Sequence, residues 1–581
     1  MATFISTTLC LVACILLNVQ GKNELVPTYF ARKYKNGSYI DATIKSNWLK
    51  ITLRPSSMLL QSSNTATLNV HPSLVKNAQY VNVTWKGVEN ASADDMIALY
   101  CPETSKDNDY YDFFNVDQSS TYSQGYGEYA VRLYNVRTNC EMRYFRCASS
   151  STGQQKFVAR SNIVMFEGGP EQPLQMHLAL TGNPTEMRVM WVSGTDQAPI
   201  VKFGRSKTKL GSIAEGKSQT YTADDFCSLE GKFIDPGYIH DVLLTALEPS
   251  TVYYYSCGVT GHMSSIRSFK TAPQIGPDVG FKFIVYGDHG ILPAAYTTAK
   301  YVLNDVKNGY EFIFYNGDIS YAKGMEYIWE QWHALIEPYS SIAPYMVGIG
   351  NHEQDHIDDS GKDPSGVKGD GWHPWWGTLK DDSYGECGVP MFYRFHMPDN
   401  GNYVWWYSYD YGMVHFIMIS TEHDLSPGSR QYVWLQEDLR NIDRLRTPWV
   451  ILGGHRPMYT SEINPKNFVV ALAFQVLFED LLHHHKVDLA FWAHYHSYER
   501  TCAIYKNACT KDGIVHIVIG TAGKDAYVSP YLPPNWSLFR RHVDPYGYGR
   551  VTLANRSALH FEYFVNSEEK VVDEVWLYKD N

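Results

Sequence analysis

The chain has 581 residues, more than one hydrophobic core usually organises, so roughly two or three domains are expected. Apolar residues make up 44% and charged residues 19%, a globular composition that argues against a chain dominated by disorder. The formal net charge of −11 gives no electrostatic reason to expect a nucleic-acid duplex or an anionic membrane as partner, so a small anionic substrate would need locally placed cations.

An apolar run from Phe4 to Val19 opens the chain, and the small residues of Val19-Gln20-Gly21 suit a signal peptidase. The run is shorter than the ~20 apolar residues of a membrane span, and no other segment approaches that length, so no span is predicted. We predict that residues 1–21 are a signal peptide, with an anchoring helix as the open alternative. The chain is then secreted to the extracellular space or cell wall, with the vacuole as another destination.

The cysteines and glycosylation tripeptides agree with secretion. Of 10 cysteines, Cys10 and Cys14 fall in the signal, which leaves an even number and predicts disulfides. Cys502 and Cys509 can close a short loop, whereas the other pairings stay open. Asn-X-Ser/Thr tripeptides, which this compartment can glycosylate, begin at Asn36, Asn82, Asn90, Asn535 and Asn555.

Two β-rich regions come next along the chain. Residues 22–168 alternate short β-rich runs with polar turns, which predicts a β-sandwich with strands near 66–70 and 80–85. Gly168-Gly169-Pro170 is a plausible linker. Residues 169–273 form a second β unit with strands near 187–192 and 252–255. Its segment from Leu247 to Tyr253 looks like the tyrosine corner of fibronectin type III domains, which indicates a scaffold.

From residue 274 to 581 the pattern becomes α/β, because strand-length apolar runs alternate with segments of helical period. The predicted strands are 281–286, 312–315, 345–349, 414–419, 449–452, 489–493 and 515–519. The predicted helices are 294–306, 327–336, 430–439 and 469–485.

Polar residues gather at the carboxyl ends of five of these predicted strands, mostly after glycine. The endings are Gly287-Asp288-His289-Gly290, Asn316-Gly317-Asp318-Ile319-Ser320-Tyr321, Gly350-Asn351-His352-Glu353, Gly453-Gly454-His455-Arg456-Pro457 and Ala493-His494-Tyr495-His496. In open α/β sheets ligands bind outside the strand carboxyl ends, so these endings together predict a site along one edge. Singly, each residue is more often a turn or core residue; their joint occurrence outweighs that interpretation.

The residue types indicate what the site holds. Two carboxylates, an amide oxygen, a phenol and three imidazoles, with no thiolate, suit hard or borderline cations such as iron, zinc or manganese. The set is large enough for two cations if one carboxylate bridges them, and paired metals are typical of phosphoryl chemistry. Such metals would also supply the cationic charge that the chain as a whole lacks.

The ordered motifs Gly-Asp-x-Gly, Gly-Asp-x-x-Tyr, Gly-Asn-His-Glu, Gly-His-x-Pro and His-x-His-x-Tyr-Glu-Arg resemble the purple acid phosphatase branch of the calcineurin-like metallophosphoesterases. The resemblance covers roughly residues 170 to 570, and the additional N-terminal region resembles the larger plant members. It implies α/β plus all-β architecture: a metallophosphoesterase α/β sandwich at 274–581 with a C-terminal β extension, preceded by the fibronectin type III-like domain at 169–273 and the β-rich domain at 22–168.

The resemblance also implies roles. Ferric iron would be bound by Asp288, Asp318, Tyr321 and His496, with Asp318 bridging and Tyr321 the phenolate that gives the family its colour. Asn351, His455 and His494 would complete a second site, which holds zinc, manganese or ferrous iron. A hydroxide held by the metals would attack phosphorus. His352 would stabilise the phosphate or protonate the leaving alkoxide.

Two departures from the family pattern limit this transfer. Ala493 stands where a glycine is usual, a change that a strand end should accept. Active plant members often carry two adjacent histidines about ten residues after the ligand His455, whereas this chain reads Thr460-Ser461-Glu462-Ile463-Asn464-Pro465. Glu462 and Lys466 are candidate substitutes only by proximity in sequence.

The expected function is acid phosphatase activity on small phosphate esters or nucleotides, with nucleotide pyrophosphatase or phosphodiesterase activity as a close variant. A catalytically weak or inactive, metal-binding extracellular protein is the alternative, because the histidine pair is missing. The natural substrate, the choice between monoester and diester, the identity of the second metal and the oligomeric state stay open, with a homodimer as one option.

Overall fold

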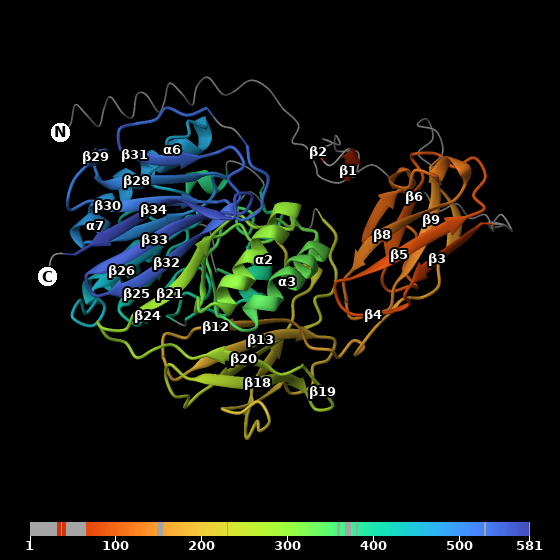
Figure 1. Ribbon diagram of the computed structural model, residues 1–581, viewed down its shortest axis with the longest axis horizontal. Helices are drawn as coiled ribbons and strands as arrows, with labels where there is room; N and C mark the ends of the chain where they lie inside the picture. Colours follow the sequence, from red (N-terminus) through yellow and green to blue (C-terminus); the bar gives the residue numbers. More distant parts are fainter. Residues whose placement is uncertain are drawn as a thin grey trace. The chain divides into compact units, whose positions relative to one another are not determined.

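The computed structural model describes residues 32–35, 38–41, 66–147, 155–228, 231–356, 361–365, 374–378, 382–398, 400–527 and 530–579. The predicted signal peptide and the tripeptide at Asn36 lie outside these residues. Figure 1 shows the strands and helices, and the chain divides into two compact units, Met1–Gly169 and Pro170–Asn581, which we describe separately.

The first unit is built from short antiparallel strands. A four-stranded sheet in the order β10-β9-β6-β7 and a three-stranded sheet β3-β5-β8 carry most of it, and Cys101 and Cys140 form a disulfide. In β5 buried and exposed residues largely alternate, as expected of a strand with one face on a core. The strands are β1 (Arg32–Lys35), β2 (Ser38–Asp41), β3 (Thr67–His71), β4 (Leu74–Val75), β5 (Gln79–Lys86), β6 (Met96–Tyr100), β7 (Asp112–Asn115), β8 (Gly127–Leu133), β9 (Glu141–Cys147), β10 (Gln155–Arg160) and β11 (Met165–Phe166).

The second unit begins with a β-sandwich. Its sheets have the orders β12-β13-β17-β16 and β15-β14-β18-β19, with β20 also paired to β18. The hydroxyl of Tyr253 accepts a hydrogen bond of 3.0 Å from the backbone N–H of Glu248, so the predicted tyrosine corner is present. The strands are β12 (Leu174–Ala179), β13 (Met187–Ser193), β14 (Ile200–Gly204), β15 (Ser212–Glu215), β16 (Lys217–Gln219), β17 (Tyr238–Leu244), β18 (Val252–Val259), β19 (His262–Met263) and β20 (Arg267–Lys270).

Two mixed sheets form the rest of this unit. A six-stranded sheet has the order β23-β22-β21-β32-β33-β34, and an eight-stranded sheet has the order β24-β25-β26-β27-β30-β28-β29 with β31 on β28. The strands are β21 (Phe281–Tyr286), β22 (Ile313–Tyr315), β23 (Tyr345–Val347), β24 (Tyr407–Tyr411), β25 (Val414–Met418), β26 (Trp449–Gly453), β27 (Leu489–Trp492), β28 (Tyr498–Tyr505), β29 (Ala508–Cys509), β30 (Ile514–Ile519), β31 (Ser537–Arg541), β32 (Gly547–Asn555), β33 (Ala558–Val565) and β34 (Lys570–Tyr578).

A buried aromatic cluster joins the two mixed sheets. The ring of Phe283 lies 5.2 Å from that of Phe416 and 6.5 Å from that of Phe491, both in edge-to-face geometry. Because Phe283 belongs to the six-stranded sheet and the other two belong to the eight-stranded sheet, these rings fill the space between the sheets. The interpretation of the chain as α/β plus all-β is confirmed.

Each predicted helical segment contains a helix, but one segment is divided, and the short helix α4 was not predicted. The segment predicted as one helix at 469–485 is α6 followed by α7, because Phe478 leaves the helical region with φ −143° and buries its ring 5.2 Å from Phe474. The helices are α2 (Pro293–Lys307), α3 (Glu326–Ser340), α4 (Val389–Arg394), α5 (Arg430–Asn441), α6 (Pro465–Leu477) and α7 (Glu479–His484).

Further disulfides connect parts of this unit. Cys227 and Cys387 are bonded across a sequence separation of 160 residues, which ties the β-sandwich region to the α/β region. Cys502 and Cys509 close the short loop that their spacing predicts. Cys257 is buried with a free thiol.

Candidate metal centre

The predicted ligands follow strands of both mixed sheets. Those from the six-stranded sheet are Asp288, Asp318, Tyr321 and Asn351, and those from the eight-stranded sheet are His455, His494 and His496. The site therefore lies where the carboxyl ends of two sheets meet, and not along the edge of one sheet as the strand-end pattern suggests. The structure brings all the predicted ligands together.

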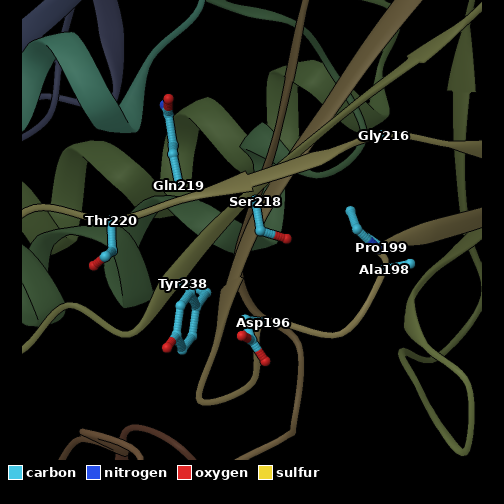
Figure 2. Close-up of a pocket in the computed structure, with 8 residues that line it drawn as sticks. All are labelled: Asp196, Ala198, Pro199, Gly216, Ser218, Gln219, Thr220 and Tyr238. Carbon is cyan, nitrogen blue, oxygen red and sulfur yellow. The ribbon is translucent and has the colours of Figure 1, made fainter.

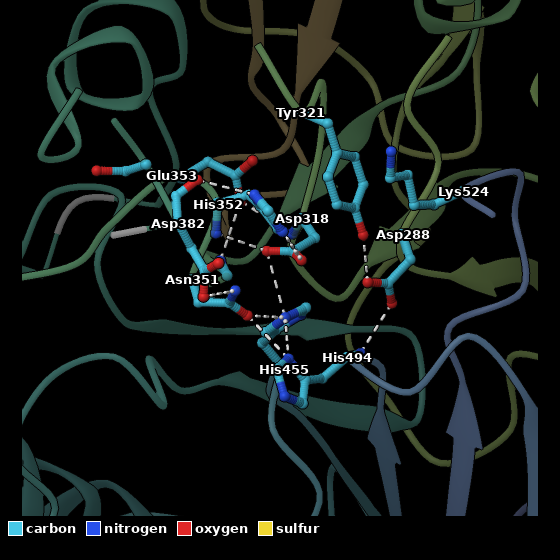
Figure 3. A network of polar contacts seen from close by, with 12 residues as sticks. Asp288, Asp318, Tyr321, Asn351, His352, Glu353, Asp382, His455, His494 and Lys524 are labelled. Atoms are coloured by element: carbon cyan, nitrogen blue, oxygen red, sulfur yellow. Dashed lines mark hydrogen bonds and ion pairs between the residues drawn. The ribbon is translucent and has the colours of Figure 1, made fainter. Parts of the chain in front are cut away.

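One group of ligands surrounds the phenol of Tyr321 (Figure 3). Its hydroxyl donates a hydrogen bond of 2.6 Å to Asp288 Oδ1 and lies 3.1 Å from His496 Nε2. His496 Nε2 is also 3.3 Å from Asp288 Oδ1. A carboxylate, a phenol and an imidazole thus converge at one point; with Asp318 they are the donor set assigned to iron.

A second group gathers around the amide oxygen of Asn351. Asn351 Oδ1 lies 3.0 Å from His455 Nε2 and 2.8 Å from His494 Nδ1, and the two ring nitrogens are 3.2 Å apart. Three atoms that can each offer a lone pair therefore face one another. Such an arrangement is stabilised by a proton or a metal ion placed among them.

Asp318 connects the two groups. Its Oδ1 is 3.3 Å from His455 Nε2, and in Figure 3 its carboxylate lies between the Tyr321–Asp288 pair and the imidazole of His455. The ligand atoms of Asp318, His455 and His494 all lie within 4.8 Å of one another. This position suits a bridging carboxylate.

Backbone carbonyls fix the orientation of two of the histidines. His455 Nδ1 donates to the carbonyl of Asn316 at 2.9 Å, and His496 Nδ1 donates to the carbonyl of Asp525 at 2.6 Å. Because a carbonyl only accepts, each Nδ1 carries the hydrogen and each Nε2 turns a lone pair toward the site.

A carboxylate fixes the amide of Asn351 in the same way. Its Nδ2 donates to Asp382 Oδ2 at 2.9 Å, so that Oδ1 faces the two histidines. Sequence reasoning missed Asp382, because it lies in a loop with no periodic pattern around it.

The electrostatics of the site favour bound cations. Burial opposes a charge on His455, but the carboxylate of Asp318 outweighs burial and raises the pKa of His455 to about 10. Burial and the charge of Arg456 hold the pKa of His494 well below its usual range. The carboxylates thus draw positive charge to the place of His455 Nε2, where a bound cation would take over from the proton, and His494 stays neutral, as a metal ligand must be.

Backbone conformation at the ligands is unusual. The φ angles of Asp288, Asp318 and Tyr321 are 57°, 55° and 57°, and that of His494 is 70°, all in the left-handed region. Such conformations cost free energy and persist where the surrounding structure requires them, typically at functional sites. The backbone also packs closely against a ligand at Gly350, where a Cβ would lie 2.1 Å from Asp318 Oδ1. These ligands fit a binuclear metal centre; their binding of metal stays a prediction.

A cavity of about 360 Å³ opens over these groups and includes the predicted catalytic residue His352 among its walls. His352 Nδ1 donates to the carbonyl of Asp382 at 2.9 Å, and its Nε2 lies 3.8 Å from Asp318 Oδ2. The His352 ring also lies 4.4 Å from the Tyr321 ring. Its position over the ligands suits a contact with the substrate's phosphoryl group.

The candidates proposed by proximity to His455 do not supply the missing histidines. Glu462 is absent from the described residues that line the cavity; its Oε1 accepts from Ser497 at 2.5 Å and pairs with Arg540 at 3.1 Å. The side chain of Lys466 lies outside the described part of the chain. The cavity instead contains Arg456, which the strand-end pattern includes but to which the sequence assigns no role.

A second hollow lies on the β-sandwich and contains none of the predicted site residues (Figure 2). Its volume is about 520 Å³, and its lining includes Asp196 from the loop after β13, Ser218 of β16 and Tyr238 of β17. Among the described residues that line it, there is no cluster of ligands comparable to that of the metal centre.

Comparison with protein families covers most of the second unit. Residues 173–271 match the purple acid phosphatase N-terminal domain, residues 281–498 match the calcineurin-like phosphoesterase domain, and residues 513–574 match the iron/zinc purple acid phosphatase-like protein C domain.

Individual relatives give the same picture. The chain is 31% identical to "Probable inactive purple acid phosphatase 9" of Arabidopsis thaliana, over 88% of this chain and 85% of that protein. It is 33% identical to "Nucleotide pyrophosphatase/phosphodiesterase" of Hordeum vulgare, over 54% of this chain and 87% of that protein. The solved structure of a purple acid phosphatase from yellow lupin (Lupinus luteus) seeds superposes with a TM-score of 0.76 at 28% identity, covering 89% of this chain and 96% of that one.

Proposed function

This chain belongs to the purple acid phosphatase family, and from that premise we propose that it is a secreted phosphoesterase that hydrolyses phosphate esters with iron(III) and a second, divalent metal ion. The observation that carries the proposal is the convergence of the predicted ligands into two groups joined by Asp318. The iron would be held by Asp288, Asp318, Tyr321 and His496. The zinc, manganese or ferrous ion would be held by Asp318, Asn351, His455 and His494.

Two bound cations would lower the pKa of water and neutralise charge on a phosphoryl group. The chain's own residues orient these components. Asp382, Asn316 and Asp525 hold the ligand side chains through the hydrogen bonds described above. His352 donates through Nδ1 to a carbonyl, and its Nε2, on the side of Asp318, would contact a phosphoryl oxygen or, when protonated, give a proton to a leaving oxygen.

A catalytically weak, metal-binding protein is the second candidate. The segment 460–465 has no histidine, and the relative with 31% identity is named as probably inactive. The name of the barley relative supports the opposite expectation, hydrolysis of nucleotide pyrophosphate or diester bonds. Turnover measurements separate the two.

Secretion is part of the proposal. The disulfides agree with an oxidising compartment, and the tripeptides at Asn82, Asn90, Asn535 and Asn555 all present an exposed asparagine. In the described residues, none of the helices has the length and apolar character of a membrane span.

The test uses the purified protein. Metal content and the visible spectrum are measured together with hydrolysis of an aryl phosphate across pH, for the natural chain, Tyr321→Phe and Asp318→Ala. We expect two metals per chain, loss of the visible band in Tyr321→Phe, and at least a 100-fold loss of kcat in Asp318→Ala. Two metals with no turnover of any ester would favour the binding protein, and a chain that binds no metal would overturn both candidates.

A further inference from the structure

The cavity over the metal centre contains a permanent cation. Of the described residues that line it, Arg456 is the one arginine or lysine, and carboxylates of Asp355, Asp382 and Glu422 line it as well. Arg456 follows His455 directly but points its guanidinium to a different place from the ligand nitrogens. It is 6% exposed, so its charge lies in a largely desolvated position.

The guanidinium is held firmly on one side. Nε donates to Glu422 Oε1 at 2.8 Å and to Oε2 at 3.0 Å, and Nη1 lies 3.4 Å from Asn467 Oδ1. Nη2 makes no hydrogen bond to any of the described residues. The side chain therefore presents fixed N–H groups in the cavity, the arrangement in which arginine binds phosphate well because little freedom is lost on binding.

The position of Arg456 relative to the ligands indicates which phosphate it reaches. Nη1 is 3.4 Å from His494 Nε2, whereas His494 Nδ1 faces Asn351 and His455. The guanidinium is thus separated from the ligand group by the width of an imidazole ring. This cation is therefore held beside the ligand group and outside it, where a second phosphate joined to the reacting phosphoryl group would find a partner.

Arg456 offers this leaving group a charge and no proton, whereas His352 is the residue of the cavity that would give a proton. Arginine stays protonated at all relevant pH values, so Arg456 cannot act as a general acid. Glu462 is engaged with Ser497 and Arg540 outside the cavity lining. An alkoxide needs a proton in order to leave, whereas a phosphate leaves as an anion that a fixed cation can neutralise.

We propose that Arg456 binds the departing phosphate and makes the site selective for phosphate–phosphate bonds, as in inorganic pyrophosphate and nucleoside diphosphates, over alkyl monoesters. In this step water forms the new P–O bond and releases a proton to solvent. The bridging P–O bond breaks, and its electron pair stays on the departing phosphate beside Arg456. This inference rests on the proposed function, and it adds a specificity residue to it.

The test must avoid leaving Glu422 buried and unpaired, which would destabilise the fold. The main variant is therefore Arg456→Gln combined with Glu422→Gln, which removes both charges and keeps amide groups that can hydrogen-bond. The matched control is Glu422→Gln alone, which removes the anion but keeps the cation and an amide oxygen that can accept from Arg456 Nε. Metal content is measured for all three proteins.

Two measurements are made on the metal-loaded proteins. The first is kcat/KM for ADP, pyrophosphate, glycerol phosphate and an aryl phosphate; the second is calorimetric binding of methylenediphosphonate and of inorganic phosphate. We expect the double variant to lose about 30-fold in kcat/KM on the diphosphates and less than about 3-fold on the aryl phosphate. We expect the natural chain to bind methylenediphosphonate about 10-fold more tightly than phosphate, and the double variant to lose this preference. Glu422→Gln should keep the preference for diphosphates in both hydrolysis and binding.

Equal losses on diphosphates and the aryl phosphate, with an unchanged binding preference, would overturn the proposal while leaving the phosphoesterase function intact. So would faster hydrolysis of glycerol phosphate than of pyrophosphate by the natural chain. If no substrate is turned over, the proposed function fails, and binding then decides the role of Arg456: a diphosphonate preference that vanishes only in the double variant supports it, and any other pattern overturns it.

Discussion

Asp382 shows how a residue that touches no metal can control a metal site. Its Oδ2 accepts a hydrogen bond of 2.9 Å from Asn351 Nδ2, and its carbonyl accepts from His352 Nδ1 at the same distance. Two predicted functional side chains are therefore oriented by one loop residue. A hydrogen-bonded partner of this kind fixes the orientation of the ligand, and its loss typically weakens metal binding.

Asp382→Ala is expected to weaken the second metal and spare the iron. The amide of Asn351 can rotate once its acceptor is lost, and the expected cost is roughly 10-fold to 100-fold in affinity for the second metal. Metal titration followed by mass spectrometry of metal content checks this. Asp424→Ala removes a carboxylate outside the cavity lining and should leave both metals in place; an unchanged second-metal affinity in Asp382→Ala would contradict the orienting role.

The ligands were accessible to sequence reasoning, whereas their supporting residues were not. Asp288, Asn351 and His455 each follow an apolar run of strand length, so pattern and residue type mark them. Asp382 and Glu422 follow no such rule, since their role depends on how loops return to the site after long intervals of sequence. The ion pair between Arg456 and Glu422 likewise joins residues 34 positions apart and forms only in the folded chain.

At the scale of elements, strands of the α/β region were predictable and one helix was not. The run 281–286 coincides with β21 because the strand lies inside a sheet and is buried along its length except at Lys282, which gives a nearly continuous apolar run. The segment 469–485 reads as one helix because its apolar residues continue through Phe478, and only packing of that ring shows where the chain leaves the helix. Periodicity reports which face is buried, but not whether the axis stays continuous.

One ionic contact between elements carries a pH dependence. His415 of β25 contacts Asp410 of β24 at 2.6 Å and Asp438 of α5 at 2.9 Å. Burial would lower the pKa of His415, but hydrogen bonds and charges of the two carboxylates outweigh it and raise the pKa to about 9. The imidazolium therefore links the sheet edge to the helix at neutral pH.

His415→Gln is expected to reduce the free energy of unfolding in a pH-dependent way. Because the pKa is raised on folding, the stabilisation is fully present below about pH 6.5 and is lost as pH rises through about 9. The variant should be less stable by roughly 2 kcal/mol at pH 6, with little difference remaining at pH 10; Asp410 is 30% exposed, so the full shift is not converted.

Urea unfolding at pH 6, 8 and 10 measures this difference. His262→Gln, at an exposed histidine of β19, serves as control and should change stability by the same small amount at each pH. A gap between the natural chain and His415→Gln that stays constant or grows toward pH 10 would exclude a stabilising imidazolium.

At the scale of the whole molecule, the predicted ligands of the metal centre all lie in the second unit. One hydrophobic cluster runs from Trp191 of the β-sandwich through Phe283 to Phe561 of the α/β region. All the predicted ligands follow residue 287, and the Cys227–Cys387 disulfide closes within this unit. The first unit has a separate small core, which includes Tyr100 and Phe145. Sequence composition alone predicts several domains but not which of them share a core.

A chain that starts at Pro170 is therefore expected to fold and keep both metals. No ligand and no residue of the large cluster is removed, because the unit boundary falls between Gly169 and Pro170. Its melting temperature should stay within a few degrees of the full chain, since the lost surface belongs to a separate core. Circular dichroism, metal content and the visible band report on fold and site independently. A truncated chain that is folded but colourless and metal-free would show that residues before 170 support the metal centre, and the division of roles between the two units would have to be abandoned.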